Sequence, residues 1–242
     1  MRIQVLGCGD AFGSGGRFNT CFGLTTADDR RVVVDFGATA MVALRQQDLY
    51  PESIDAVVLT HLHGDHFGGL PFLLLYFQFE ARRERALTIL GPPETAARLE
   101  ALTRAMFGSW PEWRFPLIFE TLTPGTPARL EGLEIDAFPV VHGSIESRAL
   151  RLRDGSSVFA YSGDTAWTDV LVEVARDADL FVMECYAPAP GCPTHTDWET
   201  LARHLPELTA RRIMLTHLNQ SMLNQPGPLG VEVLRDGMRF EI

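Results

Sequence analysis

The feature that most constrains this chain is a block of ionisable side chains at residues 60–66, which read THLHGDH. The block follows directly on the apolar run AVVL of residues 56–59, and such a run predicts a buried strand. His61 and His63 are two positions apart, so in an extended chain their side chains point to the same side. We infer that both imidazoles bind one metal ion.

Asp65 and His66 complete the block at the point where Gly64 lets the chain bend into the next helix. A carboxylate and a third imidazole then begin a second metal position beside the first. Imidazole and carboxylate ligands suit zinc, manganese or iron, and the absence of a thiolate from the block argues against a closed structural zinc site. The block therefore predicts an open site that supports chemistry.

Three later residues repeat this placement, because each follows an apolar run that predicts a strand. They are His142 after IDAFPVV, Asp164 after VFAYSG, and His217 after IMLT. Ligands at the ends of several strands converge on one rim of the sheets, which is where α/β folds carry their functional loops.

The full set resembles the metal-binding residues of the metallo-β-lactamase superfamily, and the resemblance runs from about Gly7 to Asn219. It implies an α/β fold, the αββα four-layer sandwich, in which two mixed sheets are flanked by helices. It also implies two divalent metal ions, with zinc favoured and manganese or iron as alternatives. By resemblance, the first ion would be held by His61, His63 and His142. The second would be held by Asp65, His66 and His217, with Asp164 bridging the two.

Asp35, at the end of the run VVVD, resembles the carboxylate that orients a ligand histidine in this superfamily. The alternative is that Asp35 caps a helix that begins near Thr39.

Within the superfamily, the Gly-rich opening of residues 7–22, SGDT at 162–165 and THLNQ at 216–220 resemble ribonuclease Z and its phosphodiesterase relatives. That branch has a glutamate and a histidine that act near the leaving group, and this chain offers Glu184 and His195. With Asp65 and Asp164 they form the expected catalytic set. The chain departs from the branch at Met183, where a histidine is usual, and at 196–197, where Thr-Asp replaces a Ser-Thr pair. His195 therefore has a second interpretation as a helix-capping or surface residue.

The expected function is hydrolysis of small or cyclic phosphodiesters through a metal-bridging hydroxide, with His195 as the acid. The alternative is a thioester, lactone or ester hydrolase of the same fold. A tRNA 3′-processing endonuclease is less favoured, because the 21 residues between His142 and Asp164 leave room for a hairpin around 153–155 but not for a tRNA-gripping arm. A diiron redox protein and a metal-bound scaffold without catalysis are two further alternatives.

The net charge of −10 disfavours a nucleic acid partner and favours a small, anionic substrate that the local charge of the metal ions attracts.

No linker or repeat divides the chain, so we expect one hydrolase domain over residues 1–242. Four irregularly spaced cysteines and no signal-peptide pattern predict a cytoplasmic protein without a membrane partner. The apolar run Leu70–Phe79 is about half of what a bilayer crossing needs and predicts a buried helix. A homodimer is a further possibility.

Two segments have open interpretations. The aromatic segment Phe107–Phe119 predicts either core cover or an oligomer contact, or else a wall of a substrate cleft. The Gly-rich opening lacks a dinucleotide fingerprint. It predicts either a loop that faces the metal cleft with Ser14, Arg17 or Asn19, or a purely structural turn.

Helices are expected at 39–47, 68–81, 93–107, 168–175 and 196–205, and a pair of strands is expected around Gly237.

Overall fold

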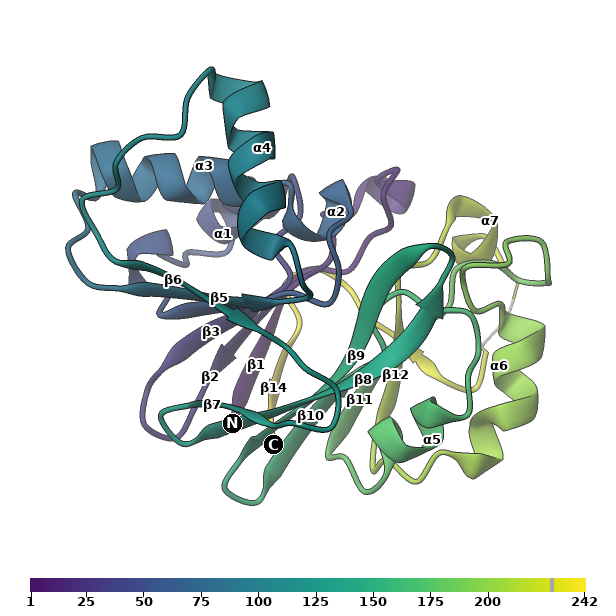
Figure 1. Cartoon of the computed structure of the whole chain (residues 1–242). Coiled ribbons are helices and arrows are strands. Elements are labelled where there is room, and N and C mark those ends of the chain that lie inside the picture. The colour runs from purple at the N-terminus through teal and green to yellow at the C-terminus, as the bar shows by residue number, and fades with distance from the viewer. Residues whose placement is uncertain (227–228) are drawn as a thin grey trace.

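The computed structural model describes residues 1–226 and 229–242. Strands of this part of the chain form two seven-stranded mixed sheets that face each other (Figure 1). In each sheet, antiparallel hairpins at one side continue into parallel strands at the other.

The first sheet has the order β14-β1-β2-β3-β4-β5-β6. Its strands are β1 (Arg2–Gly7), β2 (Cys21–Thr25), β3 (Arg31–Val34), β4 (Ala56–Val58), β5 (Leu87–Gly91), β6 (Leu117–Thr121) and β14 (Arg239–Glu241).

The second sheet has the order β13-β12-β11-β10-β9-β8-β7. Its strands are β7 (Ala128–Leu130), β8 (Leu133–His142), β9 (Ile145–Asp154), β10 (Ser157–Tyr161), β11 (Leu180–Glu184), β12 (Ile213–Thr216) and β13 (Glu232–Val233). The predicted hairpin around residues 153–155 is the β9–β10 turn, in which Asp154 pairs with Ser157.

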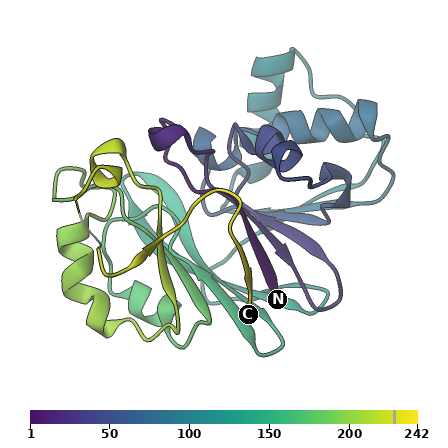
Figure 2. The ribbon, with the colours of Figure 1, turned by 180° about the vertical axis from the view of Figure 1, so that it is seen from behind.

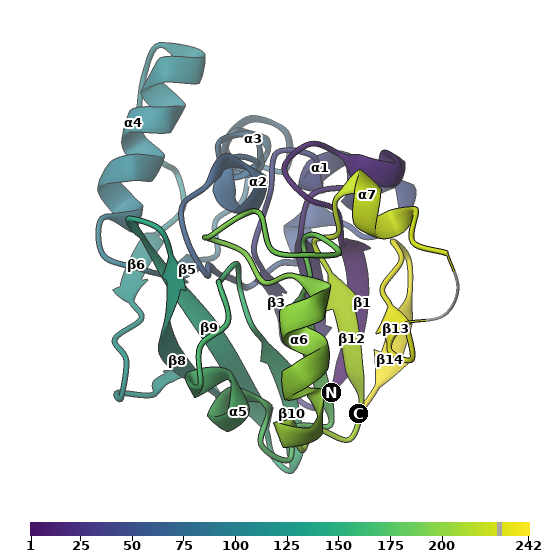
Figure 3. The same ribbon diagram turned by 90° about the vertical axis from the view of Figure 1, so that its right-hand side faces the viewer.

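Helices cover the outer face of each sheet, as Figure 3 shows from the side. The first sheet carries α1 (Ala40–Gln46), α2 (Gly64–Phe67), α3 (Leu70–Leu75), which continues as a π-helical turn (Tyr76–Glu80), and α4 (Thr95–Phe107). The second carries α5 (Val170–Ala175), α6 (Trp198–His204) and α7 (Gln220–Leu223). Short 3-10 turns lie at Ser14–Gly16, Pro51–Ser53 and Leu205–Glu207. The four layers expected from the sequence are confirmed.

Three apolar layers hold the sandwich together. The central layer lies between the sheets and joins side chains such as Phe22 of β2 to Phe159 and Tyr161 of β10. One outer layer packs α1, α3 and α4 on the first sheet, and the other packs α5, α6 and α7 on the second. Because side chains alternate along a strand, each strand feeds the central layer and one outer layer in turn.

The strands expected as a pair around Gly237 do not pair with each other. β13 pairs with β12 in the second sheet, whereas β14 pairs with β1 in the first. Figure 2 shows this last stretch of chain crossing from one half of the molecule to the other. Asp236 holds the crossing in place, because its carboxylate accepts hydrogen bonds from the backbone amides of Cys8 and Phe18 at 3.0 and 2.9 Å.

The helix expected from residue 93 begins at Thr95 instead. Glu94 has a left-handed backbone (φ 68°), which is incompatible with a helix start at Pro93. The helix ends as expected at Gly108, whose φ of 77° closes the last turn. Among the described residues, no helix is long and apolar enough to cross a membrane.

Replacing Phe22 by Ala should lower the free energy of unfolding by about 3–5 kcal/mol, because the fully buried ring joins the two sheets and its loss leaves a cavity. Urea unfolding followed by circular dichroism measures the change. Phe79→Ala is the control, because that ring is 63% exposed and its loss should cost little. An equal loss in both variants would show that the sheets do not depend on this contact.

Candidate metal centre

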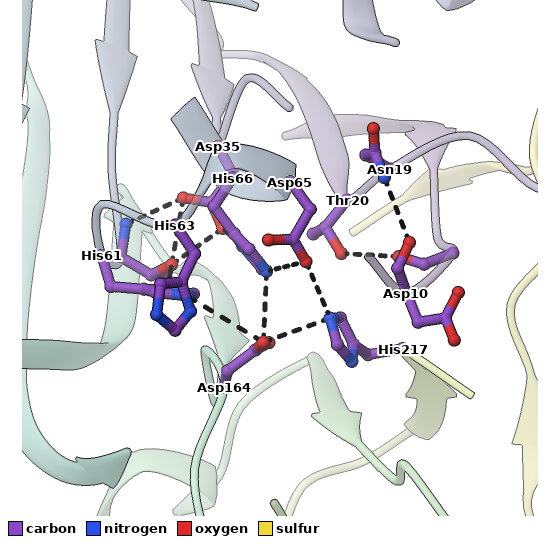
Figure 4. Close-up of polar contacts among 12 residues, drawn as sticks. Asp10, Asn19, Thr20, Asp35, His61, His63, Asp65, His66, Asp164 and His217 are labelled. Carbon is purple, nitrogen blue, oxygen red and sulfur yellow. Dashed lines mark hydrogen bonds and ion pairs between the residues drawn. The ribbon is translucent and has the colours of Figure 1, made fainter. Parts of the chain in front are cut away.

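The ionisable residues singled out in the sequence meet at one rim of the sandwich, between the two sheets. Figure 4 shows several of them, among them His61, Asp164 and His217, converging from the two halves of the chain. His61 and His63 follow β4, His142 ends β8, Asp164 follows β10, and His217 follows β12. The two sheets therefore share one site, and neither sheet supplies it alone.

The first group of donors consists of His61, His63 and His142, whose nearest ligand atoms lie within 4.8 Å of one another. The Nε2 of His142 lies 3.1 Å from the Nδ1 of His63. His61 and His142 are buried and His63 is half-buried, so the group has an inner wall and one side that faces outward.

The second group consists of Asp65, His66, Asp164 and His217, whose ligand atoms also lie within 4.8 Å of one another. One oxygen of Asp164, Oδ2, lies 3.3 Å from Nε2 of His66 and 3.1 Å from Nε2 of His217. The same oxygen is 4.0 Å from Nε2 of His61 in the first group. Asp164 therefore stands between the groups, as a bridging carboxylate requires.

Asp35 and Thr60 orient two of the histidines, because they contact the Nδ1 atoms of His66 and His61. The Asp35 carboxylate is fully buried and lies 2.7 Å from Nδ1 of His66. It also accepts hydrogen bonds from the amide and the hydroxyl of Thr60, and that hydroxyl lies 3.0 Å from Nδ1 of His61. With Nδ1 engaged in both rings, Nε2 is the nitrogen that faces the site and is available to a metal ion. Asp35 is thus not a helix cap, the alternative that the sequence left open.

The backbone at the rim adopts conformations that side chains rarely take. Asp35 and His217 have φ values of 57° and 60°, in the left-handed region. Gly163, next to Asp164, also has φ 60°, and a Cβ there would lie 2.5 Å from the carbonyl oxygen of Arg148. Such strain persists only where the surrounding structure holds it, and it is concentrated at functional sites.

The residues fit a pair of divalent ions. Several buried polar atoms of the cluster make no hydrogen bond within the described residues, namely His61 Nε2, His66 Nε2 and Asp164 Oδ1. Buried polar groups are normally satisfied, so unpartnered ligand atoms gathered in one cluster fit the binding of metal ions. Imidazole nitrogens and carboxylate oxygens are the donors that zinc takes in open, catalytic sites.

The electrostatics of the two groups differ. Burial lowers the pKa of His61, His63 and His142, so these rings are neutral and able to coordinate at neutral pH. Burial also acts to lower the pKa of His66 and His217, but the surrounding carboxylates, Asp164 and Asp65 among them, together outweigh it and raise the pKa of both. In the metal-free protein, protons on these two rings thus balance the carboxylates, and a metal ion would displace them.

Glu184 and His195 form a pair beside the second group. Nδ1 of His195 lies 2.8 Å from Oε2 of the fully buried Glu184. Burial alone would lower the pKa of His195, but the hydrogen bond and charge of Glu184 raise it to about 9. His195 does not cap α6, because Asp197 does so by accepting a hydrogen bond from the amide of Thr200 at 2.9 Å. The structure therefore places His195 at the site.

The sequence analysis did not predict three contacts of the site. Thr60 belongs to the THLHGDH block, and its neighbour His61 was the available signal. Tyr186 stacks on His195 with the ring centroids 4.8 Å apart, and its position two residues after Glu184 was a weak signal. The carbonyl oxygen of residue 194 lies 2.8 Å from Nδ1 of His142. It is a backbone atom, so no residue type in the sequence indicates this contact.

The two segments with open interpretations now have positions. Trp110 and Trp113 pack against the outer layer of the first sheet and Phe115 is buried in it, so the aromatic segment covers core. Of the three candidates in the Gly-rich loop, Asn19 lines the cavity beside the metal centre. Ser14 instead bonds Asp10 at 2.7 Å, and Arg17 extends toward Cys8.

Comparison with known proteins identifies the family. The family described as "Anti-Pycsar protein Apyc1" matches residues 1–234. Protein ML1173 of Mycobacterium leprae is 32% identical over 223 residues, which cover 90% of this chain and 78% of that protein. The probable metallo-hydrolase YhfI of Bacillus subtilis is 27% identical over 224 residues, covering 90% and 87%. Ribonuclease Z of Haloferax volcanii is 27% identical, covering 100% and 95%.

The crystal structure of YhfI, described as a metallo-β-lactamase fold protein, superposes with a TM-score of 0.80. The superposition covers 99% of this chain and 98% of that chain at 21% identity. This chain belongs to the Apyc1 family, within the metallo-β-lactamase superfamily and among ribonuclease Z-like relatives. The resemblance read from its motifs is thereby confirmed.

Replacing Asp35 by Asn should weaken metal binding about 10- to 100-fold, because the amide cannot accept from both Thr60 and His66 and so releases the orientation of the ring. Competition with a chromophoric chelator measures the affinity. Asp48→Asn is the control, because Asp48 shares the left-handed backbone (φ 56°) but lies exposed, away from the site. Unchanged affinity in Asp35→Asn, with the fold intact by circular dichroism, would contradict this role.

Proposed function

We propose that this member of the Apyc1 family is a metal-dependent phosphodiesterase that hydrolyses small or cyclic phosphodiesters, with zinc as the favoured metal and manganese or iron as alternatives. The observation that carries the proposal is the position of the hydrogen-bonded His195–Glu184 pair at the edge of a two-part donor cluster. The related ribonuclease Z is, by its name, an enzyme that hydrolyses RNA, which supports phosphodiester chemistry for this site.

Charge favours an anionic substrate at this rim. The chain has a net charge of −10, but two divalent ions would bring four positive charges against the two carboxylates of Asp65 and Asp164. Bound ions of this kind lower the pKa of water toward about 7 and so supply hydroxide at neutral pH, together with a positive centre for phosphate oxygens. A small phosphodiester is thus attracted to the site, whereas a long polyanion meets a repulsive surface.

The residues of the chain have separate roles in holding the ions and orienting the ligands. His61, His63 and His142 would hold the first ion. Asp65, His66 and His217 would hold the second, and Asp164 would hold both. Asp35 and Thr60 fix the ring orientations on which this arrangement depends.

His195 acts on the leaving group. In hydrolysis, the water oxygen forms a bond to phosphorus while the bond from phosphorus to the ester oxygen breaks, and that oxygen needs a proton. With Nδ1 held by Glu184, Nε2 of His195 is the ring nitrogen left to donate it. Glu184 keeps the ring charged and oriented, as a buried carboxylate does beside a catalytic imidazole.

A thioester, lactone or ester hydrolase is the second candidate. The observation that favours it is the apolar wall of the cavity beside the metal centre, which would also accept an acyl group.

The first test is hydrolysis of bis(p-nitrophenyl) phosphate by the purified protein with zinc or manganese, compared with a chelated control. Metal-dependent turnover supports the phosphodiesterase. No turnover by a protein that carries two metal ions contradicts it and favours esters.

Replacing Asp164 by Ala should reduce metal-dependent turnover to the background rate while preserving the fold, because this carboxylate lies between the two donor groups. Steady-state kinetics and metal analysis by mass spectrometry measure both effects. Asp169→Ala, an exposed residue at the start of α5, serves as the matched variant that should keep full activity. Near-normal hydrolysis by Asp164→Ala would refute the assignment of the cluster.

Replacing His195 by Gln should slow diesters with an alkoxide leaving group by about 10²- to 10⁴-fold, which is the usual contribution of a positioned acid. The same variant should slow bis(p-nitrophenyl) phosphate far less, because nitrophenolate leaves without a proton. The ratio of the two rates for wild type and variant is the readout. His204→Gln is the control, because His204 makes a similar pair with Glu207 at 2.9 Å on the surface. Equal losses on both substrates would rule out proton donation by His195.

A further inference from the structure

Tyr186 lies beside the pair formed by Glu184 and His195. It follows Glu184, the last residue of β11, by two positions. The chain between them stays extended beside β12, because the amide of Cys185 donates to the carbonyl of Thr216 at 3.0 Å. Residues two apart in an extended chain point to the same side. Glu184 and Tyr186 therefore both reach His195, the first by a hydrogen bond and the second by its ring.

The backbone of Tyr186 connects two loops of the site. Its amide donates to the carbonyl of Thr196 at 2.8 Å, and its carbonyl accepts from the amide of Asn219 at 2.9 Å. Thr196 directly follows His195, and Asn219 lies two residues after His217. These bonds give the ring of Tyr186 a fixed place next to His195. Because they join backbone atoms, they persist when the side chain of Tyr186 is replaced.

The ring of Tyr186 covers one face of the His195 imidazole. The two centroids lie 4.8 Å apart and the planes differ by 27°, which is an offset stack. His195 also stacks on His217, at 5.4 Å and 15°, and meets His142 edge-on at 4.8 Å and 75°. Of these three neighbouring rings, that of Tyr186 is the one outside the candidate ligand set.

The hydrogen bond to Glu184 does not by itself fix the direction of His195. Within residues 1–226 and 229–242, the imidazole makes one hydrogen bond, from Nδ1 to Oε2 of Glu184 at 2.8 Å. A single hydrogen bond holds one atom and lets the ring tilt about it, which moves Nε2. A proton donor must lie about 2.6–3.2 Å from the oxygen that it protonates. A misplacement of about 1 Å can cost about 10²-fold in rate, so a contact that prevents the tilt matters.

We infer that Tyr186 is a positioning residue for the proposed acid, and that its ring, stacked on His195, keeps Nε2 directed at the leaving oxygen. The inference rests on the proposed phosphodiesterase function and adds how the acid is held in place. The face of the ring carries this role, and the hydroxyl does not. Phenylalanine should therefore replace Tyr186, whereas leucine, which cannot stack, should not.

Steady-state kinetics with two diesters test this role. Hydrolysis of cyclic AMP breaks a bond to an alkoxide oxygen that needs a proton, whereas bis(p-nitrophenyl) phosphate releases nitrophenolate, which does not. Tyr186→Leu should lower kcat for cyclic AMP about 10- to 100-fold and hardly change kcat for the nitrophenyl diester. Tyr186→Phe should keep both rates. Tyr50→Leu is the control, because Tyr50 is 60% exposed and precedes the 3-10 turn Pro51–Ser53, away from the site.

A double variant shows whether Tyr186 acts through His195. Adding Tyr186→Leu to His195→Gln should slow cyclic AMP no further, because a residue that acts through another has no effect once the other is gone. Crystal structures of the zinc-loaded variants give a readout without turnover. The imidazole of His195 should take more than one orientation in Tyr186→Leu and a single one in Tyr186→Phe.

Four results would overturn the inference while leaving the phosphodiesterase in place. They are equal slowing of both diesters by Tyr186→Leu, unchanged turnover of cyclic AMP in that variant, additive losses in the double variant, and loss of zinc from Tyr186→Leu by mass spectrometry. A wild type that cleaves only the nitrophenyl diester also overturns the inference alone. Absence of metal-dependent hydrolysis of both diesters by wild type overturns the proposed function and the inference with it.

Discussion

The candidate metal centre depends on one buried carboxylate, that of Asp35. It lies at the end of β3, accepts from Thr60 at the end of β4, and contacts His66 in α2. A buried charge without partners would destabilise the fold. Separating any one of the three segments would leave the Asp35 carboxylate without a partner, so this energetic penalty keeps the segments together. The same contacts turn the imidazoles toward the site. Stability and ligand orientation thus have one physical cause.

The second constraint is the meeting of two sheets at one rim. Each sheet carries parallel strands at one side, and the loops that follow them bring donors from residues as far apart in the sequence as 61 and 217. The apolar layer between the sheets fixes the distance between these loops, because close-packed side chains leave little freedom to shift. A site made from both halves therefore forms only when the sandwich is complete.

Charge is distributed unevenly over this framework. The chain is acidic as a whole, yet the candidate ligands of the site are mostly imidazoles, and burial lowers the pKa of three of them. Ions bound there would create a positive centre inside an acidic surface, which selects small anions over long ones. The cavity beside the candidate metal centre has a mainly apolar wall, which would suit the organic part of such a substrate.

The sequence by itself determined the elements and the donor set. The alternation of apolar runs with His and Asp at their ends predicted most strands within a few residues and all seven donors that the structure gathers, because burial and local periodicity are properties of short segments. It did not predict the separate sheets of β13 and β14 or the start of α4 at Thr95. Those depend on which distant segments meet, as with Asp236 and Cys8 or α4 and the metal centre, and only the packing of the whole chain decides such contacts.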